Sequence, residues 1–68
     1  MPTEILKKLT HEQRLTIGEY ANIIKSRSDS YKNEYRFKLQ GYLTALKDLK
    51  IINESEKRNL YTYFTREN

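Results

Sequence analysis

Apolar side chains recur at helical spacing between Tyr31 and Leu49, and no proline interrupts them. At about 100° per residue, they gather within roughly a third of a turn. The members of this sector are Tyr35, Leu39, Tyr42, Leu46 and Leu49, and Tyr31 falls on the same face. The pattern predicts one long amphipathic helix over about residues 30–50, with this sector as its core face.

A shorter helix is predicted to begin near His11. Thr10 stands three residues before Gln13, a spacing at which the two side chains reciprocally satisfy free backbone amides at a helix start. An apolar stripe follows at three- and four-residue spacing: Ile17, Tyr20, Ala21 and Ile24, with Leu15 and Ile23 at its edges. Gly18 interrupts this stripe at a cost of about 1 kcal/mol relative to alanine, and we interpret it as a close helix approach.

A third helix is predicted to follow Asn53 and to end near Thr65. Asn53 and Glu56 repeat the capping spacing. The apolar face of this helix is predicted to comprise Leu60, Tyr61 and Phe64, with Ile51 and Ile52 packing at the turn before it.

The serine-rich run 26–30 predicts the break before the long helix, with Asp29 or Ser30 as its cap. Residues 2–9 form either a short helical turn or a frayed tail.

These elements predict a single all-α domain over residues 1–68. Its architecture is a three-helix domain with the long helix in the centre, one helix packed on each side, and a short N-terminal helix as an optional addition. A chain of 68 residues with 37% hydrophobic content buries a small core, and it has no cysteine for disulfides. We therefore expect self-association, most simply a dimer. The absence of cysteine and of long apolar runs favours a cytoplasmic protein that does not enter a membrane.

The side of the long helix opposite its core face is also partly apolar. Phe37, Gly41, Thr44 and Ala45 gather there, which implies a second packing surface for the first helix, a second copy or a partner. Aromatic and arginine side chains supply much of the energy of protein interfaces. The hypothesis for a partner-binding surface therefore comprises Arg36, Phe37, Gln40, Gly41, Thr44 and Lys47.

Positive charge concentrates in the same third of the chain. The whole chain has 13 Lys and Arg against 9 Asp and Glu, a net charge of +4. An excess of this size lies between Lys25 and Lys50, where it can attract phosphate or an acidic protein surface. The alternative hypothesis is therefore a small DNA- or RNA-binding protein that contacts phosphates through Lys25, Arg27, Lys32, Arg36, Lys38, Lys47 and Lys50.

Residues for catalysis or metal binding are sparse. His11 is the single histidine, and the sequence pairs it with neither a nucleophile nor further metal ligands. Glu54 and Glu56 are two residues apart and therefore point to different sides of a helix. The two isolated glycines, Gly18 and Gly41, form no phosphate-binding loop. We expect neither an enzyme nor a bound metal or cofactor.

The stretch from Gly41 to Glu56, with Leu60 and Phe64 following, carries a Gly-x-Leu-x-x-Leu pattern, a short turn and a carboxylate-capped helix. It resembles the C-terminal helical hairpin of small uncharacterised proteins encoded by bacteriophages and mobile elements of Gram-positive bacteria. The resemblance implies an intracellular accessory protein that binds and modulates a host or phage protein, including inhibitors of host defence. Lys50 stands where a glycine often closes the first helix of such a hairpin.

Overall fold

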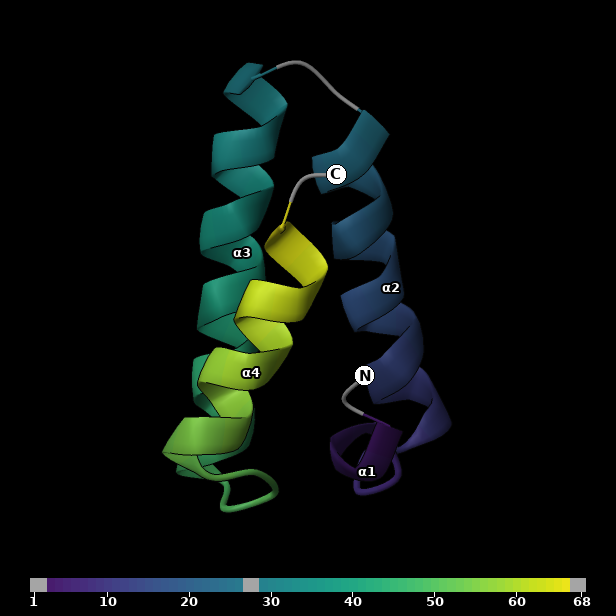
Figure 1. Ribbon diagram of the computed structural model, residues 1–68, viewed down its shortest axis with the longest axis vertical. Coiled ribbons are helices and arrows are strands. Elements are labelled where there is room, and N and C mark those ends of the chain that lie inside the picture. Colours follow the sequence, from purple (N-terminus) through teal and green to yellow (C-terminus); the bar gives the residue numbers. More distant parts are fainter. Residues whose placement is uncertain (1–2, 27–28, 67–68) are drawn as a thin grey trace.

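The computed structural model describes residues 3–26 and 29–66, and all of the regular secondary structure in these residues is helical. Its helices are α1 (Thr3–Leu6), α2 (His11–Ser26), α3 (Asp29–Asp48) and α4 (Glu54–Thr65). Helices α2 and α3 run antiparallel, and α4 lies across the front of both (Figure 1). The all-α fold with a long central helix is confirmed.

One apolar core lies between the three longer helices. Ile17 and Ile24 of α2, Leu39 and Leu43 of α3, and Leu60 of α4 are each at most 2% exposed. Because α2 also contacts α4, the three helices enclose this core together, and α2 and α4 pack on the same sector of α3. The prediction of one helix on each side of the long helix is therefore wrong, and the side of α3 that bears Phe37 remains outside the bundle.

Two of the predicted helix starts have the expected hydrogen bonds. The Thr10 backbone amide donates to Gln13 Oε1 at 2.9 Å, and the Gln13 amide donates to Thr10 Oγ1 at 3.1 Å. Asn53 and Glu56 form the same reciprocal pair at the start of α4. These capping boxes and the end of α4 at Thr65 confirm the boundaries derived from the sequence.

The N-terminal segment is part of the fold rather than a frayed tail. Helix α1 is a single turn, but Ile5 and Leu9 are 8% and 4% exposed and belong to the core cluster. Lys8 Nζ lies 2.6 Å from Glu56 Oε2, which ties this segment to the first turn of α4. The optional short N-terminal helix therefore exists and covers one end of the core.

Helix α3 ends in a left-handed residue that is not glycine. Lys50 has a φ of 64°. The Ile51 amide donates to the Leu46 carbonyl oxygen at 3.0 Å, and the Lys50 amide donates to the Lys47 carbonyl oxygen at 2.9 Å. This pair of bonds defines a Schellman motif, in which a left-handed residue reverses the chain and satisfies the last carbonyls of a helix. The turn places Ile52 in the core, at 3% exposed.

The prediction that Tyr31 and Leu49 belong to the core face of the long helix is wrong. Tyr31 is 54% exposed and Leu49 is 70% exposed. Helix α3 has 20 residues, whereas α2 has 16 and α4 has 12, so its neighbours do not cover its full length. The prediction of a cap at Asp29 or Ser30 also needs correction, because α3 already includes both residues and its cap position lies outside the described residues.

The interpretation of Gly18 as a close helix approach is wrong as well. A Cβ atom added at Gly18 would meet nothing within 4 Å apart from its chain neighbours and the backbone of its own helix, and the same is true at Gly41. Neither glycine is required by packing within the chain. None of the helices in the described ranges is long and apolar enough to span a membrane.

Candidate partner-binding surface

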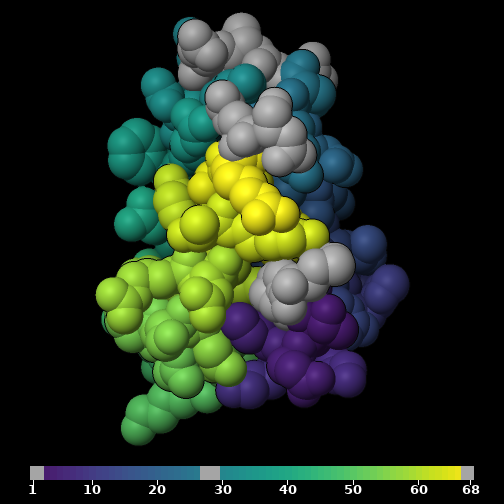
Figure 2. Space-filling view, viewed as in Figure 1, coloured from purple at the N-terminus to yellow at the C-terminus, as the bar shows by residue number. Residues whose placement is uncertain are grey.

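The outward side of α3 presents an aromatic ring among small and polar residues. We call Phe37, Gln40, Gly41 and Thr44 the outer face of α3. Phe37 is 75% exposed and is the most exposed large hydrophobic side chain in the described part of the chain. Gln40 and Gly41 are exposed and Thr44 is half-buried, with its hydroxyl donating to the Gln40 carbonyl oxygen at 2.8 Å. Side chains of α3, shown in teal, project beyond the cover of α4 in the space-filling view (Figure 2).

Arg36 and Lys47 lie beside the outer face and are held by their neighbours. Both side chains are half-buried. Arg36 Nη1 donates to Asn33 Oδ1 at 3.3 Å. Lys47 Nζ lies 3.4 Å from Glu54 Oε1, so it joins α3 to the start of α4. These two cations therefore form a positioned rim, and Phe37 is the residue of the hypothesised surface that projects most freely.

The cations of the alternative nucleic-acid hypothesis do not form one surface. Lys38 and Lys47 are nine residues apart, which is about two and a half helical turns, so they project from opposite sides of α3. Lys38 Nζ lies 3.5 Å from Glu34 Oε2 and 4.5 Å from the centre of the Tyr35 ring. Lys25 on α2 and Lys50 in the turn after α3 are exposed. Lys32 is half-buried and interacts with another group, and Arg27 lies outside the described residues.

Three tyrosines, Tyr20, Tyr35 and Tyr42, are packing residues of the bundle. Tyr20 of α2 contacts Tyr35 and Tyr42 of α3, with ring centres 5.8 Å and 6.3 Å apart. All three rings pack against the core cluster. Rings in tilted or edge-on contact stabilise the helix pair, and they are not exposed for nucleic-acid bases to stack on them. The interpretation of Tyr35 as a core tyrosine is thus correct.

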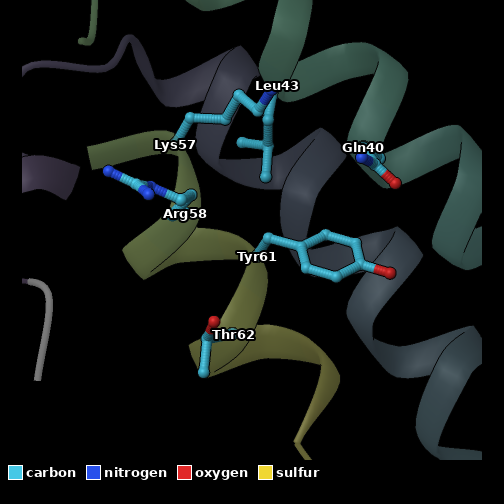
Figure 3. A pocket seen from close by; sticks show the side chains of 6 residues that line it. All are labelled: Gln40, Leu43, Lys57, Arg58, Tyr61 and Thr62. Atoms are coloured by element: carbon cyan, nitrogen blue, oxygen red, sulfur yellow. The ribbon is translucent and has the colours of Figure 1, made fainter. Parts of the chain in front are cut away.

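A hollow of about 150 Å³ lies between α3 and α4, next to the outer face. Leu43, which is fully buried, forms its floor. Around the floor lie Gln40, Lys57, Arg58, Tyr61 and Thr62. Figure 3 shows Lys57 extending toward Leu43, the Tyr61 ring below Gln40, and Arg58 directed away from α3. Gln40 belongs to both the hollow and the outer face, so the two features are continuous.

Positively charged side chains near the start of α4 stabilise the ionised form of Glu54. Desolvation raises the pKa of Glu54, but it is outweighed by the charge of Lys57, by the hydrogen bond and charge of Lys47, and by the charge of Arg58. The pKa of Glu54 is consequently below its ordinary value. Glu54 Oε2 lies 3.7 Å from Lys57 Nζ. Two lysines from two helices therefore flank one carboxylate beside the hollow, and Arg58 adds to the positive charge around it.

Sequence reasoning did not find the hollow. Its α4 residues, Lys57, Arg58, Tyr61 and Thr62, were not among the candidate site residues, and no local pattern marks them. The hollow depends on how α4 crosses α3, and this crossing is set by the Schellman turn and the core contacts. The presence of Tyr61 on an apolar face was the single available signal.

The described residues contain no group of three or more histidine, cysteine, aspartate or glutamate side chains placed to hold a metal ion. His11 is exposed in the first turn of α2. Comparisons of the chain with protein-family models, with curated proteins and with solved structures gave no match.

Proposed function

We propose that this chain is a small intracellular regulator or inhibitor that acts by stoichiometric binding to a protein partner, in the manner of phage and mobile-element accessory proteins. The observation that carries the proposal is the 75% exposure of Phe37 on a face that no described element covers. Large exposed aromatics beside small residues are typical of interface centres, where such rings provide much of the binding energy.

The surroundings of Phe37 support a protein contact. The small residues Gly41 and Thr44 leave room on this face, and Arg36 and Lys47 supply a polar rim. A helix with a glycine at its contact surface lets another backbone approach closely. Gly41 is not needed by the fold, since an added Cβ would meet nothing within 4 Å. The surface therefore comprises Arg36, Phe37, Gln40, Gly41, Thr44 and Lys47, as hypothesised from the sequence.

The experiment is a pull-down of tagged chain from a bacterial lysate with and without nuclease, followed by mass spectrometry. The matched variants are Phe37→Asp and Leu49→Asp, because Leu49 is also strongly exposed, at 70%, but lies at the end of α3. We expect one nuclease-resistant protein, retained by Leu49→Asp and lost with Phe37→Asp. Circular dichroism of both variants should show an unchanged helical fold, since neither side chain is in the core.

Other outcomes contradict the proposal. Recovery of nucleic acid, with protein lost after nuclease, would make the basic side chains the functional surface, and binding should then weaken steeply with salt. In that case reversing the charge of Arg36 and Lys47 should abolish binding while the fold persists. Recovery of the chain itself alone would indicate a self-assembling structural subunit.

A further inference from the structure

The hollow between α3 and α4 has the size of one side chain. Its volume is about 150 Å³. Binding sites for drug-sized ligands and cofactors are larger and enclose about 300–1,000 Å³. A leucine or phenylalanine side chain fits a space of this size, and the half-buried Tyr61 ring and the methylene chain of Lys57 in its lining provide apolar contacts. The geometry therefore suits an anchor residue of a protein rather than a small-molecule ligand.

The rim of the hollow selects for negative charge. Lys57 and Arg58 line it, and Lys47 of α3 lies nearby, paired with Glu54 at the start of α4. Gln40, Tyr61 and Thr62 add an amide and two hydroxyl groups, each of which can donate a hydrogen bond. The carboxylate of Glu54 lies 3.4 Å from Lys47 Nζ and 3.7 Å from Lys57 Nζ, so two of these cations already bind a carboxylate beside the hollow.

We infer that this hollow is an anchor site that takes an apolar side chain carried on an acidic segment of the protein partner. The apolar side chain contacts the Tyr61 ring and the methylene chain of Lys57, while neighbouring carboxylates bind Lys57 and Arg58. Because Gln40 joins the hollow to the outer face of α3, Phe37 contacts the same partner beside the anchor. This inference rests on the proposed function and specifies the chemistry of the partner.

The probes are three synthetic peptides of equal length. The first has a leucine flanked on each side by two aspartates, the second has asparagines in place of the aspartates, and the third has glycine in place of the leucine. Each is titrated into the ¹⁵N-labelled full chain while backbone amide shifts are recorded. We expect the first peptide to shift the amides of Gln40, Leu43, Lys57 and Tyr61, and both analogues to bind at least several-fold more weakly.

Three variants test the charges separately. Arg58→Gln removes a cation at the rim and should weaken the first peptide by about two- to fivefold, the range for one exposed ion pair. Glu54→Gln removes the carboxylate that occupies the same cations and should strengthen binding by a similar factor. Lys25→Gln makes the same charge change as Arg58→Gln on α2, away from the hollow, and should leave binding unchanged.

Three results would overturn the inference: no shift at these amides with about 5 mM of the first peptide, well above a millimolar dissociation constant; equal binding of the asparagine peptide; or equal weakening by Lys25→Gln. Failure here is distinguishable from failure of the proposed function. A partner captured by the native chain, lost with Phe37→Asp and unaffected by Arg58→Gln would leave the function standing and remove the anchor site.

Discussion

Lys50 shows how a single residue can carry backbone strain in an otherwise regular fold. Its φ of 64° lies in the left-handed region, which costs a residue with a Cβ atom roughly 1–2 kcal/mol. Glycine adopts this conformation freely and is the usual residue at this position of a Schellman motif. The lysine gains nothing evident from the turn, so the position is open to stabilisation.

Replacing Lys50 with glycine should therefore raise the free energy of unfolding by about 1 kcal/mol, after the greater freedom of glycine in the unfolded chain is subtracted. Urea denaturation followed by circular dichroism measures this change. Lys50→Ala is the control, because it removes the same charge and keeps the Cβ atom, and it should give no gain. Equal stability of the two variants would show that the φ angle is not strained.

The two carboxylate oxygens of Glu56 accept hydrogen bonds from different donors. Its Oε1 accepts from the Asn53 amide at 2.9 Å, and its Oε2 accepts from Lys8 Nζ at 2.6 Å. These two hydrogen bonds, with the Lys8 bond the stronger cause, lower the pKa of Glu56 below its ordinary value against a smaller opposing effect of desolvation. The ionised form is therefore favoured by folding.

The pH dependence follows from this direction. A lowered pKa gives stability that is present above the ordinary glutamate pKa of about 4.3 and is lost as the pH falls through the lower value of the folded chain. Glu56→Gln keeps an oxygen for the Asn53 amide but cannot ionise. We expect its melting temperature to fall less than that of the native chain between about pH 5 and pH 3. Lys8→Met should flatten the curve in the same way, and parallel curves for all three proteins would refute the linkage.

At the scale of elements, the sequence predicts the features that depend on residues close together in the chain, such as helix caps and shared helix faces. Both capping boxes, at Thr10 and at Asn53, were found because their side chains and backbone amides lie within three residues. The central apolar positions of α3 were also found, since helical spacing determines which residues share a face. The exposure of Tyr31 and Leu49 was missed because it depends on how far α2 and α4 extend.

The two glycines show the same limit. Their isolation within helices marks them as unusual, but spacing alone does not show whether a neighbour approaches. Apart from chain neighbours and the helix's own backbone, the structure places nothing within 4 Å of a Cβ at either position. The same holds for the candidate site. The grouping of Phe37 and its neighbours on one face could be predicted from helical periodicity, whereas the hollow at Gln40 depends on how α4 crosses α3 and could not.

Gly18→Ala and Gly41→Ala should each raise the free energy of unfolding by about 1 kcal/mol, because alanine loses less backbone entropy in a helix. Chemical denaturation measures both. The two variants should differ in partner binding, since Gly41 lies on the outer face of α3 and Gly18 lies on α2. We expect Gly41→Ala to weaken the partner complex and Gly18→Ala to leave it intact. Equal binding by both would mean that no backbone approaches Gly41.

At the scale of the whole molecule, the core is small enough for single side chains to decide folding. A chain of 68 residues has roughly 3–10 kcal/mol of stability at the usual value per residue. Leu39 and Phe37 lie two residues apart on α3 and have opposite environments, with exposures of 0% and 75%. They form a matched pair for separating the core from the surface.

Leu39→Ala should cost about 2–5 kcal/mol through lost burial and the cavity it leaves, which is a large share of the total stability. Phe37→Ala should change the stability of the monomer by less than about 0.5 kcal/mol. Urea denaturation at two protein concentrations measures both effects. A midpoint that rises with concentration, and loses this dependence in Phe37→Ala, would show that a second copy covers the outer face, because association stabilises the folded state by mass action. A midpoint independent of concentration in both proteins would show that the bundle is stable alone, and Phe37 would then be exposed for a different partner.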